Sequence, residues 1–267
     1  MTAFAMTVTD SATLFRRNLR RLVRYPSMTV QLVVLPVLVL LLFVYVFGDQ
    51  LGHGLSAPLA GGHTLRAGYL NYVVPGVLLL TVAAAVQGTA IVVAMDMTGG
   101  IIDRFRTMAI ARASFLTSHV LASLTQVVTS IAVVLGVSVA LGFRPTADRA
   151  EWLAAMALIV LFAFALIWLA TALGLAAKSV ETASNTPIFI VLLVFLGSGF
   201  VPASTMPAGL RQFACWQPFT PVTETVRGLL TGTHIGANAI AAVVWSVGIV
   251  LVSYLWATHL YRTREPR

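Results

Sequence analysis

The chain has 267 residues, of which 58% are hydrophobic and 10% are charged, whereas a soluble domain carries about 25% charged residues. This composition excludes a soluble globular protein and predicts a membrane protein. A net charge of +8 would suggest a nucleic acid partner for a soluble protein, but the charges are too sparse here, and no nucleic acid partner is expected. The single cysteine, Cys215, excludes an intramolecular disulfide bond and a metal site built from several cysteines.

Six charge-free runs divide the chain, and each exceeds the roughly 20 residues that a helix needs to cross a bilayer core. Charged side chains are costly in hydrocarbon, so they mark where a span ends. The runs lack the alternation of polar and apolar residues that is typical of membrane β-barrels. The sequence therefore predicts an all-α membrane protein with six transmembrane helices, near residues 28–47, 70–95, 114–141, 152–177, 186–201 and 237–261.

Basic residues are distributed unevenly between the predicted segments on the two sides of the membrane. With a cytoplasmic N-terminus, the inner segments carry 12 Lys and Arg residues and the outer segments carry five. Because short loops rich in Lys and Arg stay in the cytoplasm, both termini are predicted to be cytoplasmic, in a multi-pass protein of the cell membrane. The apolar run after Arg24 has no small-residue cleavage pattern, so we interpret it as a retained first span.

Residues 10–25 are predicted to form an amphipathic helix along the inner membrane face. At about 100° per residue, the large apolar side chains from Leu14 to Val23 fall on one half of the helix and five arginines fall on the other. The arginines suit lipid phosphates or a partner protein, and the pattern leaves both roles open. They are Arg16, Arg17, Arg20, Arg21 and Arg24.

The segment between the second and third spans has its own amphipathic pattern. After Gly99 and Gly100 interrupt the second span, apolar residues recur at helical spacing from Ile101 to Ala109, beside charged residues. This pattern predicts a short helix parallel to the membrane. Lipid and a partner protein would both suit its apolar face.

Residues 202–236 form the last external segment, which is rich in proline. Its aromatic residues, Phe213, Trp216 and Phe219, are unusual for a water-exposed loop. Because backbone at membrane depth needs protein or trapped water for its hydrogen bonds, we predict short re-entrant or interfacial helices packed into the outer mouth. The fifth span is short, and Gly197-Ser198-Gly199 is expected to let it turn into this segment.

Two charged residues stand close together in that external segment. Glu224 and Arg227 are three residues apart in a predicted helix, a spacing at which side chains meet. We therefore predict a pair near the outer mouth. An ordinary surface pair is the alternative.

Patterns for catalysis and for nucleotide binding are absent from the sequence. The stretch nearest to a phosphate-binding loop, Gly174 to Ser179, lacks the glycine before its lysine. We therefore expect neither enzymatic activity nor a metal site. His119 and His259, near span ends, are expected to form interfacial hydrogen bonds. None of the predicted spans contains Asp or Glu, which transporters driven by proton or sodium gradients usually keep at mid-membrane.

Three stretches of the chain resemble the type-2 permeases of ATP-binding-cassette exporters, in the daunorubicin-resistance permease branch. The first runs from Tyr69 to Leu78, at the start of the second span. The second runs from Asp96 to Arg112 and departs from the family at Ala109, where proline is common. The third is divided between residues 200–207, 217–221 and 227–232.

The resemblance implies that the whole chain, residues 1–267, is one transmembrane permease domain that exports a hydrophobic drug, antibiotic or lipid. Two such subunits, identical or homologous, would work with two copies of a separate ATPase subunit, which binds ATP and magnesium. ATP binding closes the ATPases on each other, and cytoplasmic helices pass this movement to the spans. This chain itself would bind no cofactor. A gradient-driven transporter or channel without an ATPase is the alternative.

The resemblance also implies roles for the two amphipathic helices. Residues 10–25 correspond to the connecting helix, which borders the ATPase. Residues 97–112 correspond to the coupling helix, which is seated in a groove of the ATPase. Its predicted contact residues are Gly100, Asp103, Arg104, Phe105, Arg106 and Arg112.

Six spans have too little perimeter to enclose a path for a large amphiphile, so two subunits are expected to meet and enclose it between them. In the family, spans one, two and five face this seam. Uncharged polar residues in these spans are the predicted path residues, with hydrogen bonds inside one subunit as the alternative role. They are Gln31, Asn71, Thr81, Gln87, Asn185 and Ser198.

Overall fold

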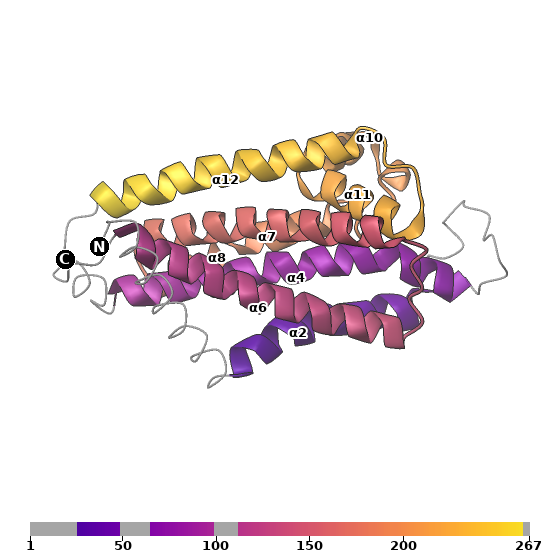
Figure 1. The fold of residues 1–267 in the computed structure, drawn as a ribbon, viewed down its shortest axis with the longest axis horizontal. Helices are drawn as coiled ribbons and strands as arrows, with labels where there is room; N and C mark the ends of the chain where they lie inside the picture. Colours follow the sequence, from indigo (N-terminus) through magenta and orange to yellow (C-terminus); the bar gives the residue numbers. More distant parts are fainter. Residues whose placement is uncertain (1–25, 49–64, 99–111, 264–267) are drawn as a thin grey trace.

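The structure is a computed structural model that describes residues 26–48, 65–98 and 112–263. In these ranges the chain is a bundle of helices without strands, and the longest helices run side by side (Figure 1). The long helices are α4 (Leu65–Thr98), α6 (Arg112–Ala140), α7 (Arg149–Ala176) and α12 (Asn238–Thr263). The shorter ones are α2 (Pro26–Leu41), a π-helical turn (Leu42–Val46), α8 (Val180–Asn185), α9 (Ile188–Phe195), a 3₁₀ turn (Ala203–Thr205), α10 (Ala208–Trp216) and α11 (Phe219–Thr231).

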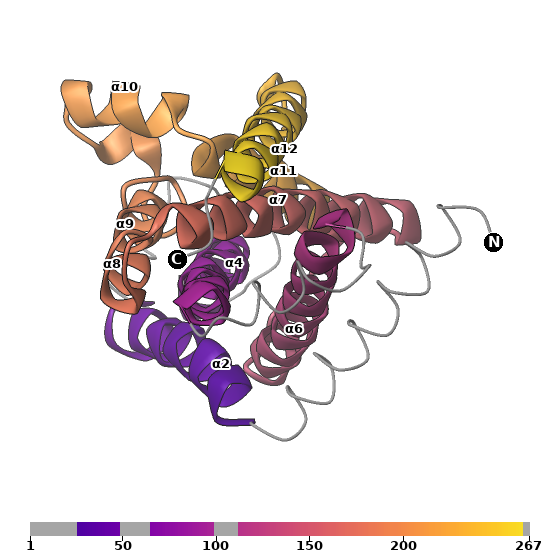
Figure 2. The same cartoon turned by 90° about the vertical axis from the view of Figure 1, so that its left-hand side faces the viewer.

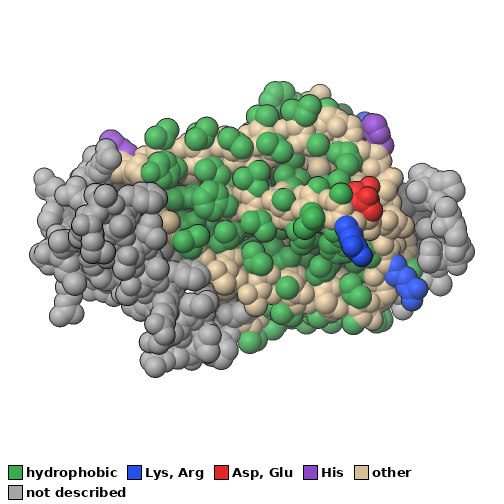
Figure 3. Space-filling model, in the orientation of Figure 1, with side chains coloured by type: hydrophobic (Ala, Val, Ile, Leu, Met, Phe, Trp, Pro, Cys, Tyr) green, Lys and Arg blue, Asp and Glu red, His purple; other side chains and the backbone are tan. Residues whose placement is uncertain are grey.

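Four of the described helices are long and apolar enough to cross a membrane, within α4, α6, α7 and α12. Two shorter apolar segments, Leu32–Val46 and Val180–Phe195, stand where the sequence predicts the first and fifth spans. Hydrophobic side chains cover the middle of the face seen in Figure 3, and the charged ones gather near one end. The helical class is therefore confirmed for the described residues, while the count of six spans stays a prediction.

α4 lies at the centre of the bundle, where α2, α6, α7 and the α8–α9 segment surround it (Figure 2). Its residues from Val73 to Ala83 are all buried. α12 lies on the outside, against α7 and α11. We call the end of the bundle at which α4 begins and α11 lies the Arg227 end, and the end at which α4 stops the Asp96 end.

Glycines allow neighbouring backbones to approach α4 closely. A Cβ atom on Gly174 of α7 would lie 2.7 Å from the carbonyl oxygen of Ala90, which is too close for a real side chain. A Cβ atom on Gly76 would overlap the backbone of Gly199. Small residues at such contacts are typical of helix packing in membranes, where close approach replaces the hydrophobic effect. These contacts hold α4 against α7 and against the chain that follows α9.

The predicted fifth span, residues 186–201, is an α-helix only from Ile188 to Phe195, and the short helix α8 precedes it. α8 ends at Asn185, and α9 begins after Pro187, which suits a helix start because proline has no backbone N–H to leave unpaired. The residues after α9 form a series of turns that includes Gly197. α10 and α11 follow, so the segment after residue 201 contains short helices, as the sequence predicts.

Candidate functional site

Arg227 is buried at one end of the bundle, with 5% of its surface exposed. It lies on α11, a helix whose side chains are mostly buried. Thr223, Thr225 and Thr231 of this helix donate to carbonyl oxygens of α11 itself, which satisfies their hydroxyl groups. A guanidinium has no such local acceptors, and burying it is costly unless partners offset the loss of water.

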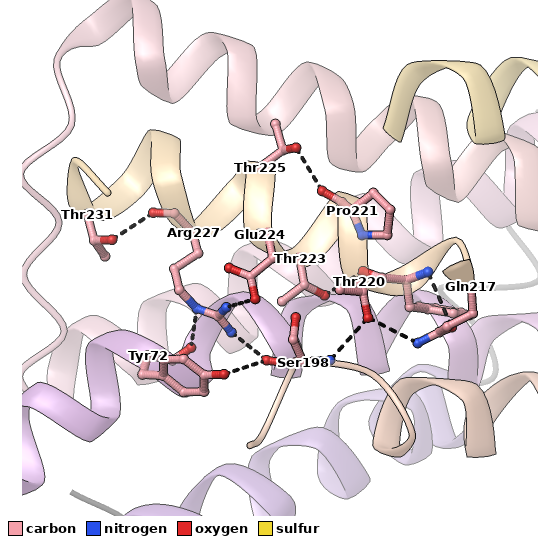
Figure 4. Close-up of polar contacts among 11 residues, drawn as sticks. Tyr72, Ser198, Gln217, Thr220, Pro221, Thr223, Glu224, Thr225, Arg227 and Thr231 are labelled. Atoms are coloured by element: carbon pink, nitrogen blue, oxygen red, sulfur yellow. Dashed lines mark hydrogen bonds and ion pairs between the residues drawn. The ribbon is translucent and has the colours of Figure 1, made fainter. Parts of the chain in front are cut away.

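The guanidinium of Arg227 contacts three parts of the chain (Figure 4). Its Nη1 lies 2.6 Å from Glu224 Oε1 on the same helix. Its Nε donates to the carbonyl oxygen of Tyr72 at 3.1 Å, and its Nη2 donates to that of Ser198 at 2.8 Å. The Arg227 Cζ also lies 3.7 Å from the centroid of the Tyr72 ring, which makes a cation–π contact. Arg227 therefore joins α11, α4 and the turn after α9.

The turn after α9 is held by further hydrogen bonds. The Tyr72 hydroxyl donates to the carbonyl oxygen of Ser198 at 2.8 Å, beside the guanidinium. The Ser198 N–H donates to Thr220 Oγ1 at 3.2 Å, and the Tyr69 hydroxyl donates to the carbonyl oxygen of Phe200 at 3.0 Å. Backbone outside a helix needs such partners in apolar surroundings, because water is not available there.

Gln217 also forms hydrogen bonds with residues on both sides of the turn after α9. Its Nε2 donates to the carbonyl oxygen of Leu193 at 3.0 Å and to Thr220 Oγ1 at 3.4 Å, and its Oε1 accepts from the Phe219 N–H at 3.4 Å. A Cβ atom on Gly197 would overlap the Gln217 amide. The end of α9 is thereby joined to the start of α11. We call the residues that make these contacts the Arg227 cluster: Tyr69, Tyr72, Ser198, Gln217, Thr220, Glu224 and Arg227.

The Arg227 cluster is a network of hydrogen bonds and one ion pair. Within the described ranges, no group of three or more His, Cys, Asp and Glu residues could hold a metal ion. The Ser198 Oγ is buried without a hydrogen-bond partner among the described atoms, and none of the cluster's contacts supplies it with a base. In surroundings of low dielectric constant, breaking one of these hydrogen bonds leaves a buried polar group unpaired, which is costly. The cluster can therefore hold α4, α11 and the turn after α9 in one arrangement.

A second buried polar contact lies at the Asp96 end. His119 Nε2 on α6 is 3.1 Å from Asp96 Oδ2 on α4, close enough for an ion pair but without the geometry of a hydrogen bond, and the two side chains are 4% and 6% exposed. The sequence predicts that the second span ends at residue 95, but α4 continues to Thr98, so Asp96 is buried within the helix. The interfacial hydrogen bond expected of His119 stays a prediction, and the contact with Asp96 joins two helices.

Comparison with known proteins assigns the chain to a family. Residues 10–231 match the family model described as ABC-2 type transporter. The chain belongs to the ABC-2 type transporter family. It is therefore a multi-pass membrane protein and a permease subunit of an ATP-binding-cassette transporter, as the resemblance of its three stretches implies.

Two curated relatives place the permease more closely. It is similar to the daunorubicin resistance ABC transporter permease protein of Streptomyces coeruleorubidus, with 26% identity over 250 residues, covering 93% of this chain and 82% of the relative. It is also similar to the probable doxorubicin resistance ABC transporter permease protein of Mycobacterium tuberculosis, with 26% identity over 178 residues, covering 65% and 64%. These similarities confirm the branch predicted from the sequence.

The predicted path residues of the permease occupy different surroundings. Asn71 is half-buried and accepts from the backbone N–H of Arg144 at 3.3 Å. Thr81 is fully buried and donates to the carbonyl oxygen of Val77 in its own helix. The contacts of both residues lie within the subunit. Whether either lines a path stays a prediction.

The remaining predicted path residues are equally scattered. The Gln87 Nε2 donates to the carbonyl oxygen of Ser184 at 2.9 Å, joining α4 to α8. Asn185 is exposed at the end of α8, and Ser198 belongs to the Arg227 cluster. Gln31 is in α2, but its side chain lies outside the described residues.

The residues predicted to face the ATPase also fall outside the part of the permease that the structure describes. These are Gly100, Asp103, Arg104, Phe105 and Arg106 of the coupling helix, the side chain of Arg112, and the arginines of residues 10–25, namely Arg16, Arg17, Arg20, Arg21 and Arg24. Their roles stay predictions.

Sequence reasoning named Glu224 and Arg227 as a pair, and the two side chains do meet. It missed Tyr72 as the partner of Arg227 on α4, Tyr69 as the donor to Phe200, and the role of Gln217. A signal was available in the sequence, because Tyr69, Tyr72 and Gln217 lie in stretches that resemble the family. Motif residues that are far apart in sequence often meet in space.

Proposed function

We propose that the permease is one of two six-span subunits of an exporter for hydrophobic drugs or similar amphiphiles, driven by ATP hydrolysis on two separate ATPase subunits. The family match over residues 10–231 is the observation that carries this proposal. The names of its relatives refer to resistance to daunorubicin and doxorubicin, which are large, largely apolar drugs with polar groups. This similarity supports a class of substrate rather than one drug.

The helices of the described bundle support six spans. The helical stretch from α2 through its π-helical turn is about 30 Å long at about 1.5 Å per residue, which matches the bilayer core. The segment of α8 and α9, Val180–Phe195, is shorter than the thickness of the bilayer core. We infer that α10 and α11 form a re-entrant segment that covers the rest of this thickness. With both termini in the cytoplasm, the Arg227 end faces outward and the Asp96 end faces the ATPase.

The seam between two subunits is proposed along α9 and α2, which lie on adjoining sides of α4, to its left and below it in Figure 2. On α9, Ile188, Phe189, Leu192 and Phe195 are between 41% and 72% exposed in the single subunit. α4 offers no such face between Val73 and Ala83, because these residues are buried inside the subunit. This arrangement favours spans one and five over span two as the main contributors to the seam.

The proposal predicts that the tagged permease, purified in mild detergent, brings down a soluble ATPase with a phosphate-binding loop. In vesicles containing both proteins, we expect doxorubicin transport that requires ATP and is blocked by vanadate. Transport that instead follows an imposed proton or sodium gradient, without ATP, would establish the gradient-driven alternative.

The seam can be tested with single cysteines on a Cys215→Ser background. Phe189→Cys on α9 is expected to form a crosslink between subunits. Ile240→Cys on α12 is the matched control, because both side chains are 72% exposed in the single subunit. A crosslink at residue 240 with none at residue 189 would place the seam on the α12 side instead.

A further inference from the structure

We infer that the buried contact between Asp96 and His119 is a positioning contact, through which α4 carries movement from the ATPase side of the permease to the Arg227 cluster. The inference rests on the proposed seat of residues 97–112 on the ATPase. Neither Asp96 nor His119 is assigned to the ATPase surface. Their role is to keep two helices in register while a neighbouring segment is moved.

The position of the contact supports this role. α4 continues only from Asp96 to Thr98, whereas α6 begins at Arg112, about 10 Å along its axis before His119. α4 and α6 are the two helices that the proposed coupling helix connects. A push on that helix would separate their ends if nothing joined them. The carboxylate and imidazole lie 3.1 Å apart between the two packed helices, so their attraction favours movement of α4 together with α6.

The chemistry of the contact indicates that it fixes the alignment of α4 with α6 more than it stabilises the fold. Removing a carboxylate and an imidazole from water is costly, and replacing a buried ion pair with apolar side chains is often neutral or stabilising. Two leucines would therefore serve packing as well in this apolar bundle. A polar contact between two defined atoms instead selects one alignment of the helices, which is the best-attested use of buried polar pairs.

Other contacts near the Asp96 end join α7 and α8 to α4. The Gly174 backbone of α7 packs against the carbonyl group of Ala90, and the Gln87 amide donates to the carbonyl oxygen of Ser184 at the end of α8. α6, α7 and α8 are thus each held to the last part of α4. A displacement of this end is shared by all of them.

At its other end α4 reaches the Arg227 cluster directly. The stretch from Tyr72 to Asp96 is about 36 Å long, close to the thickness of the bilayer core. Tyr72 offers Arg227 both its carbonyl oxygen and its ring, whereas the other contacts of Arg227 belong to α11 and to the turn after α9. A shift or rotation of α4 therefore changes the Tyr72 contacts first. Pro75, inside α4 and one turn from Tyr72, is a place where the helix can bend.

The test uses the complex of permease and ATPase in vesicles, with Asp96→Ala, His119→Ala and the exchange of Asp96→His with His119→Asp. Cys215, the only cysteine of the chain, is exposed on α10 and reports on the Arg227 end through its rate of reaction with a thiol reagent. Doxorubicin is the transported probe. Ser138→Ala is the matched control, since Ser138 is buried on α6 but donates within its own helix.

Both single variants are expected to retain the ATPase and to hydrolyse ATP, but to move about tenfold less doxorubicin per ATP. ATP with vanadate should change the reaction rate of Cys215 in the unaltered permease and in Ser138→Ala, and not in the single variants. The exchanged pair should restore both readouts. A contact that serves stability alone would lower the amount of complex without changing drug moved per ATP, and that result would overturn the inference.

Two further outcomes separate the inference from the proposed function. If the unaltered permease binds no ATPase or transports without ATP, the proposed function fails. If it transports with ATP and both single variants do so with unchanged efficiency, only the inference fails. Should the single variants not assemble, Asp96→Leu combined with His119→Leu removes both polar groups at once. This variant is expected to assemble and remain uncoupled, and efficient transport by it would also overturn the inference.

Discussion

The two ends of α4 are held in different ways. At the Arg227 end the side chains of the cluster bind backbone carbonyl groups, of Tyr72 in α4 and of Ser198 in the turn where the chain leaves helical structure after α9. At the Asp96 end α4 and α6 are continuous helices whose backbone groups are already paired, and the side chains of Asp96 and His119 contact each other between them. A contact between side chains can be rebuilt by exchanging residues, whereas a backbone acceptor stays an acceptor after any substitution.

The largest effect is expected from Arg227→Ala. It leaves the carboxylate of Glu224 and the carbonyl oxygens of Tyr72 and Ser198 without their main donor, which typically costs about 3–5 kcal/mol for a buried charged group. We expect little folded permease, measured by size-exclusion chromatography and thermal unfolding in detergent. Arg211→Ala is the control, since Arg211 is exposed on α10. An Arg227→Ala variant as stable as this control would contradict the structural role of the cluster.

The second prediction concerns exchange of charges at the two ends. Glu224→Arg combined with Arg227→Glu is expected to remain as unstable as Arg227→Ala, because a glutamate cannot donate to the carbonyl oxygens that Arg227 binds. The exchange at Asp96 and His119 is expected to restore function. Thermal unfolding of the Glu224 and Arg227 variants, and doxorubicin moved per ATP by the Asp96 and His119 variants, measure the contrast, each beside the single variants. Recovery at the Arg227 end would show that the Glu224 pair dominates there.

Gly76→Ala is expected to have an intermediate effect. Its Cβ atom would overlap the backbone of Gly199, so α4 must move away from the turn after α9. Overpacking of this kind costs about 1–3 kcal/mol. Gly88→Ala is the control on the same helix, since no atom lies within 4 Å of its Cβ position. Equal melting temperatures for the two variants would mean that α4 and the turn are not in close contact.

The smallest effect is expected from Tyr72→Phe. The substitution removes the hydrogen bond to the Ser198 carbonyl oxygen, worth about 1 kcal/mol, and keeps the ring beneath the guanidinium of Arg227. Tyr72→Leu removes the ring as well and should lose about 1 kcal/mol more. Thermal unfolding of both variants separates the two contributions. If Tyr72→Leu is no less stable than Tyr72→Phe, the cation–π contact adds nothing measurable.

The positions of the helices could be predicted from the sequence because charged residues are costly in hydrocarbon and therefore bound each apolar run. The boundary failed at Asp96, where α4 continues past the charge. The reason is physical: partners offset the cost of burying a carboxylate, and one of them, His119, lies on another helix. Hydropathy along one segment carries no information about such a partner.

The sequence alone determined the helical class, the family, the turn at Gly197 and the local pair of Glu224 and Arg227, because each depends on neighbouring residues or on a motif. Only the tertiary structure decided that α4 is central, that Arg227 binds Tyr72 and Ser198, and that Asp96 meets His119. These contacts depend on how separate helices pack, and packing is set by shape and close approach over the whole bundle. Residues distant in the chain then meet, and no local pattern predicts which of them will.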